Sequence, residues 1–202
     1  MGLAKAKPHW TVEEYLAFEK TSLIRHEYVS GQLYAMAGTT KNHNRISDDL
    51  GAVLNRKFAQ QGQPCEAFTS DVKVYVNPEV YYYPDVVITC EQVIEAGEED
   101  DYIAEHPSAL VEIISPSTGR TDRYEKMREY QFIPSLREYL IIEQTHYQVE
   151  VYRHTAAGEP WQKEVYTDPE QVVVVASVKA SFTLAEIYAR VRFGAATEDE
   201  ER

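Results

Sequence analysis

The sequence contains few cysteines and no long hydrophobic run. Cys65 and Cys90 are the only cysteines among 202 residues, and they do not form a CxxC pair. We expect them to be reduced thiols in a cytoplasmic protein, with a structural disulfide as the alternative. No apolar run reaches the roughly 18 residues that cross a bilayer. The N-terminus, MGLAKAKPHW, also lacks the apolar core of a signal peptide. The membrane-spanning and disulfide-rich secreted classes are therefore not expected.

Internal repeats and Pro- or Gly-rich linkers are absent as well. A chain of this length can bury one sizeable hydrophobic core. We therefore expect a single domain over residues 1–202.

Positive charge is scarce, with 20 Lys and Arg against 33 Asp and Glu and a net charge of -13. Most of the excess falls in an acidic loop at 91–105, which contributes -7, and in an acidic C-terminal tail at 197–202, which contributes -3. The rest of the chain is near balance. This distribution argues against a strong sequence-independent DNA clamp and leaves room for a weak or metal-bridged contact with phosphate.

Sequence signals in the N-terminal third of the chain predict two helices and a pair of short strands. Thr11 and Glu14 have capping-box spacing and predict a short helix over 11–20. Residues 26–38 resemble two short strands around a turn at Ser30 and Gly31. Apolar residues at helical spacing predict a long helix over 42–62, which Asn42 can cap and Gly62 can end.

The middle of the chain predicts a sheet. Three strand candidates cover 66–76, 84–90 and 109–115, and a helix candidate runs from 121 to about 132, before Pro134. Further strands are expected at 138–144, 148–154 and 171–178, with a closing helix at 184–191. The order from residue 42 to 144 is helix, three strands, helix, strand. It predicts an α/β or α+β fold with a mixed sheet.

Glu112 is the unusual residue of the strand ALVEIIS. Side chains alternate along a strand, so Leu110, Glu112 and Ile114 share one face while Val111 and Ile113 share the other. A carboxylate among apolar neighbours needs a cation, a metal or hydrogen-bond donors. The alternative is a solvated edge position or an ordinary salt bridge.

Asp85 begins another apolar strand, directly after Pro84. If the two strands are neighbours, Asp85 and Glu112 converge at one edge of the sheet. Two close carboxylates repel each other unless one is protonated or a divalent cation bridges them, and Mg²⁺ suits such oxygen ligands. The alternative for Asp85 is a turn or capping role.

Three further sets of side chains have both a functional and a structural interpretation, and Glu27 has a structural one. Lys126, four residues after Asp122 on the predicted helix, can point to Glu112 or form a surface ion pair with Asp122. His43 can be a ligand or an exposed helix-end histidine, and Glu27 is expected to be a solvated strand residue. The tyrosines 81–83 can stack on bases or cover the edge of the sheet.

Taken together, these segments resemble the Uma-two family, whose members are described as restriction endonucleases of the PD-(D/E)XK superfamily. The resemblance covers about residues 10 to 190. The matching positions are Pro84, Asp85, Glu112, Ser115, Pro116, Ser117, Thr118, Asp122, Arg123, Lys126, Tyr130, Glu138 and Tyr139.

The resemblance implies a restriction-endonuclease-like core and a Mg²⁺- or Mn²⁺-dependent endonuclease that acts on DNA, as a homodimer. Asp85 and Glu112 would bind the metal and Lys126 would complete the catalytic set, with Glu27 and His43 at the rim of the site. The superfamily motif has a lysine two residues after the acid, where this chain has Ile114. Lys126 would replace it. Two rival functions are a non-catalytic binding module on the same fold and a metal hydrolase of a small phosphodiester.

Overall fold

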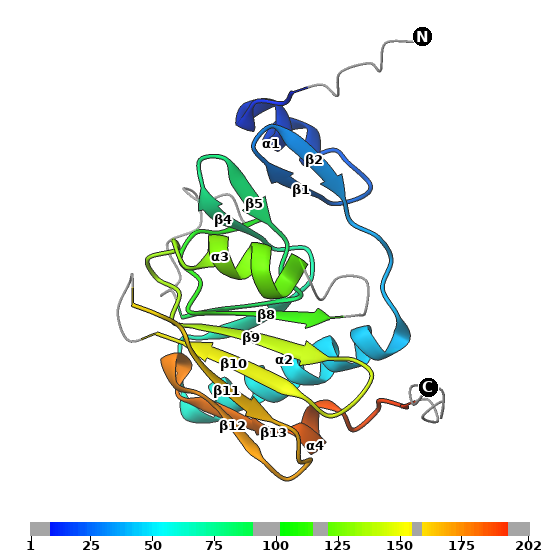
Figure 1. Cartoon of the computed structure of the whole chain (residues 1–202), viewed down its shortest axis with the longest axis vertical. Coiled ribbons are helices and arrows are strands. Elements are labelled where there is room, and N and C mark those ends of the chain that lie inside the picture. The colour runs from blue at the N-terminus through cyan, green and yellow to red at the C-terminus, as the bar shows by residue number, and fades with distance from the viewer. Residues whose placement is uncertain (1–8, 91–101, 115–120, 155–158, 194–202) are drawn as a thin grey trace, which may run out of the picture.

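The computed structural model describes residues 9–90, 102–114, 121–154 and 159–193. Most of the acidic loop and the whole acidic tail at 197–202 therefore lie outside the described residues. Two larger sheets and a two-stranded ribbon make up the strands (Figure 1). Among the described residues, no helix has the length and apolar character needed to span a membrane.

The central element is a six-stranded mixed sheet in the order β11-β10-β9-β8-β6-β3. Its parallel pair is β8 and β9, and the other neighbours are antiparallel. Its strands are β3 (Glu66–Thr69), β6 (Val86–Thr89), β8 (Ala109–Ile114), β9 (Glu138–Glu143), β10 (Val149–Arg153) and β11 (Gln162–Tyr166).

A five-stranded sheet with the order β2-β1-β5-β4-β7 and a separate β12-β13 ribbon complete the strands. They are β1 (His26–Val29), β2 (Gln32–Ala35), β4 (Lys73–Asn77), β5 (Val80–Tyr82), β7 (Ile103–Ala104), β12 (Val172–Val175) and β13 (Ala180–Thr183). The helices are α1 (Val12–Glu19), α2 (Lys41–Gln61), α3 (Met127–Tyr130) and α4 (Leu184–Ile187), with a π-helical turn at Thr121–Lys126 and a 3₁₀ turn at Ala176–Val178.

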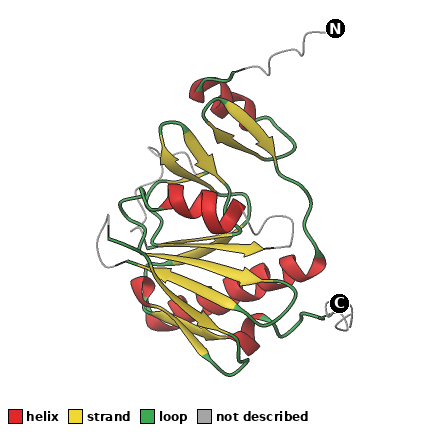
Figure 2. Ribbon diagram, viewed as in Figure 1, coloured by secondary structure: helices red, strands yellow, loops and turns green. Residues whose placement is uncertain are grey.

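Helices cover both faces of the six-stranded sheet (Figure 2). On one face, Val111 and Ile113 of β8 pack in a core with α2, α4 and the β12-β13 ribbon. On the other face, Leu110 and Ile114 pack with Tyr130 of α3 and with strands β4 and β5. The alternation predicted for β8 is therefore confirmed. Within the six-stranded sheet, the order α2, β3, β6, β8, α3, β9 also agrees with the predicted restriction-endonuclease-like order of helix, three strands, helix and strand, while β4, β5 and β7 between them belong to the other sheet.

Several elements differ from the prediction. Strands β5, β7, β11 and β13 were not predicted, and the strand expected at 171–178 ends at Val175, where a 3₁₀ turn follows. The segment 66–76 is not one strand, because Ser70 and Asp71 both have φ of 62° and turn the chain from β3 into β4 of the other sheet. The long helix is capped by Thr40, whose hydroxyl accepts from the amide of His43 at 3.1 Å, and not by Asn42. The closing helix α4 is shorter than predicted.

The expectation of reduced thiols is wrong, because the structure joins Cys65 and Cys90 in a disulfide. The antiparallel register of β3 and β6 pairs Glu66 with Thr89, which places the two cysteines opposite each other. The sequence does not reveal this pairing, because the cysteines are 25 positions apart. The disulfide closes the end of these two strands that lies away from Asp85.

Gly51 allows the long helix α2 to approach the sheet closely. It is buried in the middle of α2, and a Cβ atom built on it would lie 2.6 Å from the methyl group of Thr69 in β3. A real Cβ atom cannot approach a methyl group so closely. The position of α2 against β3 therefore depends on the missing side chain.

Gly51→Ala should destabilise the protein although alanine favours helices by about 1 kcal/mol over glycine. The added methyl group overpacks the contact with Thr69, at a cost of about 1–3 kcal/mol. We expect a net loss of about 1 kcal/mol in the free energy of unfolding by urea denaturation. The double variant with Thr69→Ser, which removes the clashing methyl group, should recover most of it. Equal effects of Gly51→Ala with and without Thr69→Ser would contradict this explanation.

Candidate active site

Asp85 and Glu112 lie opposite each other on neighbouring strands. Strands β6 and β8 pair antiparallel with Val86 opposite Val111, and the next position outward in this register pairs Asp85 with Glu112. The predicted neighbourhood of the two strands is therefore confirmed. The two acidic residues stand where β6 begins and where β8 approaches its end.

Glu112 is buried, with 3% of its surface exposed, and it has both a cation and a hydroxyl beside it. Its Oε1 atom accepts from Nζ of Lys126 at 3.0 Å and from the hydroxyl of Tyr130 at 2.9 Å. These charge-assisted contacts offset the desolvation of the carboxylate. Of the explanations considered for a carboxylate in an apolar strand, the structure therefore contains the cation and the hydroxyl donor.

Tyr130 is fully buried beneath this carboxylate. Burial, and then the negative charge of Glu112, raise the pKa of the Tyr130 hydroxyl well above its usual range. The hydroxyl therefore stays protonated at neutral pH and can only donate to Glu112. Its donation holds the carboxylate in one orientation.

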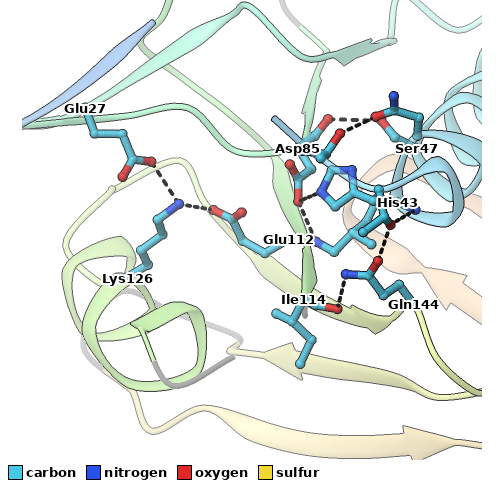
Figure 3. Close-up of polar contacts among 12 residues, drawn as sticks. Glu27, His43, Ser47, Asp85, Glu112, Ile114, Lys126 and Gln144 are labelled. Carbon is cyan, nitrogen blue, oxygen red and sulfur yellow. Dashed lines mark hydrogen bonds and ion pairs between the residues drawn. The ribbon is translucent and has the colours of Figure 1, made fainter. Parts of the chain in front are cut away.

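Lys126 reaches the site from the turn that follows β8 (Figure 3). Its Nζ atom lies 2.8 Å from Oε1 of Glu27 as well as 3.0 Å from Glu112, and 5.4 Å from the centre of the Tyr82 ring. Lys126 ends the π-helical turn, and Tyr130 ends α3 four residues later, so both side chains reach one carboxylate. Wide turns of this kind occur often at functional sites.

Asp85 is held by a different set of partners. Its Oδ2 atom accepts from the amide of Ile113 at 2.6 Å and lies 3.0 Å from Nε2 of His43. His43 stands in the first turn of α2, where the Thr40 cap fixes its backbone. Within the described ranges, Nδ1 of His43 has no hydrogen-bond partner, and both of these contacts of the Asp85 carboxylate use Oδ2. Asp85 thus keeps one oxygen available to a ligand.

All five residues proposed from the sequence line one open pocket of about 330 Å³. They are Glu27, His43, Asp85, Glu112 and Lys126. Glu27 comes from β1, so the pocket is bounded by both large sheets and by the start of α2. Glu27 is thus not a freely solvated strand residue, because it contacts Lys126.

The chemistry of these side chains suits a hard divalent cation with an incomplete protein shell. In the part of the chain that the structure describes, no three His, Cys, Asp or Glu side chains form a complete metal cage. Mg²⁺ does not require one, because it commonly binds through one or two carboxylates and keeps several waters. Asp85 and Glu112 are the two carboxylates of the pocket that could hold such an ion.

Sequence reasoning missed two residues of this site. The sequence places Tyr130 four residues after Lys126, close to one face of the predicted helix, but this spacing alone assigns it no role at the site. Gln144 lines the pocket and donates from Nε2 to the carbonyl of Ile114 at 3.1 Å, while its Oε1 accepts from Thr40. It directly follows β9, which runs parallel to β8, so the ends of these two strands meet.

Other candidate side chains do not reach the site or cannot be placed. Tyr81, Tyr82 and Tyr83 are all buried, so the structural interpretation as sheet cover is correct and base stacking is not. The side chains of Asp122 and Arg123 lie outside the described part. The predicted surface pair of Asp122 with Lys126 is therefore not tested, but Lys126 itself is buried.

Lys126→Met should lower the free energy of unfolding by about 3 kcal/mol, because the change leaves two acidic side chains close together without this cation. Glu27→Gln in the Lys126→Met background should recover part of the loss, since it removes one of the two negative charges. In the wild-type background the same Glu27→Gln change should destabilise. Urea denaturation of the four proteins measures the coupling. Additive effects would show that the Lys126–Glu27 contact contributes nothing.

The sequence of the chain is similar to a family of known proteins. Residues 12–186 match the model of the Uma2 family, described as "Putative restriction endonuclease". An uncharacterized protein of Synechocystis, slr1290, is 33% identical over 187 residues, which cover 92% of this chain and 95% of the relative. A second Synechocystis protein, sll1609, is 32% identical over 144 residues, which cover 71% and 80% of the two chains.

A solved structure shows the same fold. The crystal structure of "a putative nuclease belonging to DUF820" from Anabaena variabilis matches with a TM-score of 0.72 at 19% identity, over 89% of this chain and 98% of the other. At this identity the match bears on the fold alone. Because the family model covers most of the chain, the protein belongs to the Uma2 family of nuclease-like proteins.

Proposed function

We propose that the protein is a Mg²⁺- or Mn²⁺-dependent endonuclease that hydrolyses phosphodiester bonds of DNA. The observation that carries the proposal is the contact of Lys126 with Glu112, across from Asp85, in one open pocket. A fixed ammonium group beside carboxylates that could hold a metal can stabilise the charge that develops during phosphoryl transfer, which supports the proposal. DNA as the substrate follows the description of the family.

Asp85 and Glu112 would hold the metal. When bound, the metal ion supplies Lewis-acid stabilisation of the phosphate and a water of lowered pKa. His43 and the amide of Ile113 orient the Asp85 carboxylate. Tyr130 orients the Glu112 carboxylate.

Lys126 would act as the lysine that the strand itself lacks at Ile114. Its ammonium group offers three donors, and Glu27 and Glu112 fix its position. A preorganised positive charge stabilises the negative charge that develops on the phosphate in the transition state. Glu27 would thus act by positioning Lys126.

A small phosphodiester is the second candidate substrate. The net charge of -13 opposes the approach of a long polyanion more than that of a small diester. Turnover of plasmid DNA beside turnover of a chromogenic diester separates the two. A non-catalytic binding module would turn over neither.

The homodimer expected from the resemblance stays a prediction, which sedimentation can test.

Asp85→Asn and Glu112→Gln should each reduce metal-dependent cleavage of DNA by at least about a hundredfold, because each removes a carboxylate ligand. Both proteins should stay folded, since amide and carboxylate have the same shape. Plasmid nicking with millimolar Mg²⁺ or Mn²⁺ measures the activity, and circular dichroism checks the fold. Asp48→Asn, on the exposed side of α2, is the matched control and should cleave normally. Wild-type turnover in either site variant would exclude the proposed metal ligands.

Lys126→Met should reduce the single-turnover rate by about 10²–10³-fold while the metal affinity changes little. The lysine is proposed to act on the phosphate or on water, so it does not contribute a ligand. Lys126→Arg, which keeps the charge, should lose less activity. Titration of metal into each variant separates rate from affinity. A normal rate in Lys126→Met would assign the role of the missing strand lysine to another residue.

A further inference from the structure

A second pocket adjoins the candidate active site at the start of α2. This α2 pocket has a volume of about 460 Å³ and is lined by Lys41, Arg45 and Arg192, together with Thr40 and Gln144. Thr40 and Gln144 also line the candidate active site. They are hydrogen-bonded to each other, so they form a shared wall between the two pockets.

The α2 pocket is positive although the net charge of the protein is -13. Three of its lining residues are basic and none is acidic. In the described ranges, Lys41, Arg45 and Arg192 make no ion pair with a carboxylate. Basic groups that line one pocket repel each other, and a bound anion would reduce this repulsion.

The N-terminus of α2 adds to this positive potential. Its first turn contains no acidic residue and instead begins with Lys41. A basic residue is unfavourable there, because the helix dipole is positive at its N-terminus. A residue that lowers local stability, as Lys41 does here, is expected at a functional site.

Asn42 holds two of the basic residues in place. Its Oδ1 atom accepts from Nη1 of Arg45 at 3.1 Å, and its Nδ2 atom donates to the carbonyl of Arg192 at 2.9 Å. The segment at Arg192 is thereby tied to α2 although it is 150 positions away in the sequence. The pocket is therefore organised before any ligand binds.

We propose that the α2 pocket binds a backbone phosphate of the nucleic-acid substrate, one that flanks the bond to be cut. Phosphate is the anion that best fits several arginine and lysine donors. Gln144, in the wall shared by the two pockets, donates to the carbonyl of Ile114, the last residue of β8 and two residues after Glu112. A phosphate in the α2 pocket would therefore lie near the candidate active site, on the same nucleic-acid strand as the reacting phosphate. The inference rests on the proposed function, which it deepens by naming a substrate contact.

DNA binding measured under conditions that prevent cleavage tests this proposal. Arg45→Gln combined with Arg192→Gln should weaken binding of a fluorescein-labelled DNA duplex by about tenfold in EDTA at low salt. It should also reduce the slope of log K against log salt by about 1. The matched control removes two charges elsewhere, Arg56→Gln on the same helix and Lys179→Gln after the 3₁₀ turn, and should change the affinity less than about twofold. Fluorescence anisotropy measures all three proteins.

The readout separates this proposal from the proposed function, because EDTA prevents metal-dependent cleavage. A protein that never cleaves DNA can still show the selective loss of binding, which supports the pocket alone. If the wild-type protein cleaves DNA and the pocket variant binds DNA as tightly as the control variant, the proposed phosphate site is wrong. The double variant with Arg45→Lys and Arg192→Lys, which keeps both charges, should retain most of the affinity.

Inorganic phosphate distinguishes a free-anion site from a substrate contact. In an NMR titration, phosphate should shift the amide signals of residues 41–45 in the wild type and not in the pocket variant, but only at millimolar concentration. The labelled duplex should bind much more tightly. Equal affinity for phosphate and for DNA would overturn the substrate role and assign the pocket to a free anion.

Discussion

The contact between Lys126 and Glu112 is the interaction on which the site depends. A carboxylate inside β8 would be costly without a partner, and Lys126 with Tyr130 provides two donors at 3.0 and 2.9 Å. The same contact fixes the turn after β8, because Lys126 ends its π-helical part. Through Glu27 it also links the six-stranded sheet to the five-stranded one. One side chain therefore connects two sheets and the candidate site.

The rest of the architecture brings these groups to one place. The antiparallel pairing of β6 with β8 places Asp85 opposite Glu112, and the parallel pairing of β8 with β9 brings Gln144 to the same end of the sheet. Helix α2 then presents His43 to Asp85 from the other side. The close approach of α2 to β3 at Gly51 supports this geometry, because it sets the height of the helix above the sheet.

Much of this arrangement could be predicted from the sequence, because it depends on local patterns. The alternation of Leu110, Glu112 and Ile114 gave the faces of β8, and the capping box at Thr11 gave the first helix. The break at Ser70 and the disulfide were not predictable in this way. The break depends on the positive φ of Ser70 and Asp71, and the identity of these two residues does not predict a positive φ. The disulfide depends on a register between distant strands, and the same limit explains why Gln144 was missed.

The charges of the two pockets suggest why a metal and a polyanion would bind together. The candidate active site carries the carboxylates of Glu27, Asp85 and Glu112 against the single ammonium group of Lys126, a formal charge of -2 with His43 neutral. Alone it repels a phosphate, and a divalent cation would neutralise it. The adjoining α2 pocket carries three positive charges. A nucleic-acid strand would thus be attracted by its flanking phosphate, while the reacting phosphate could approach only when the metal is bound. Affinity and chemistry would then depend on different pockets, separated by the wall of Thr40 and Gln144.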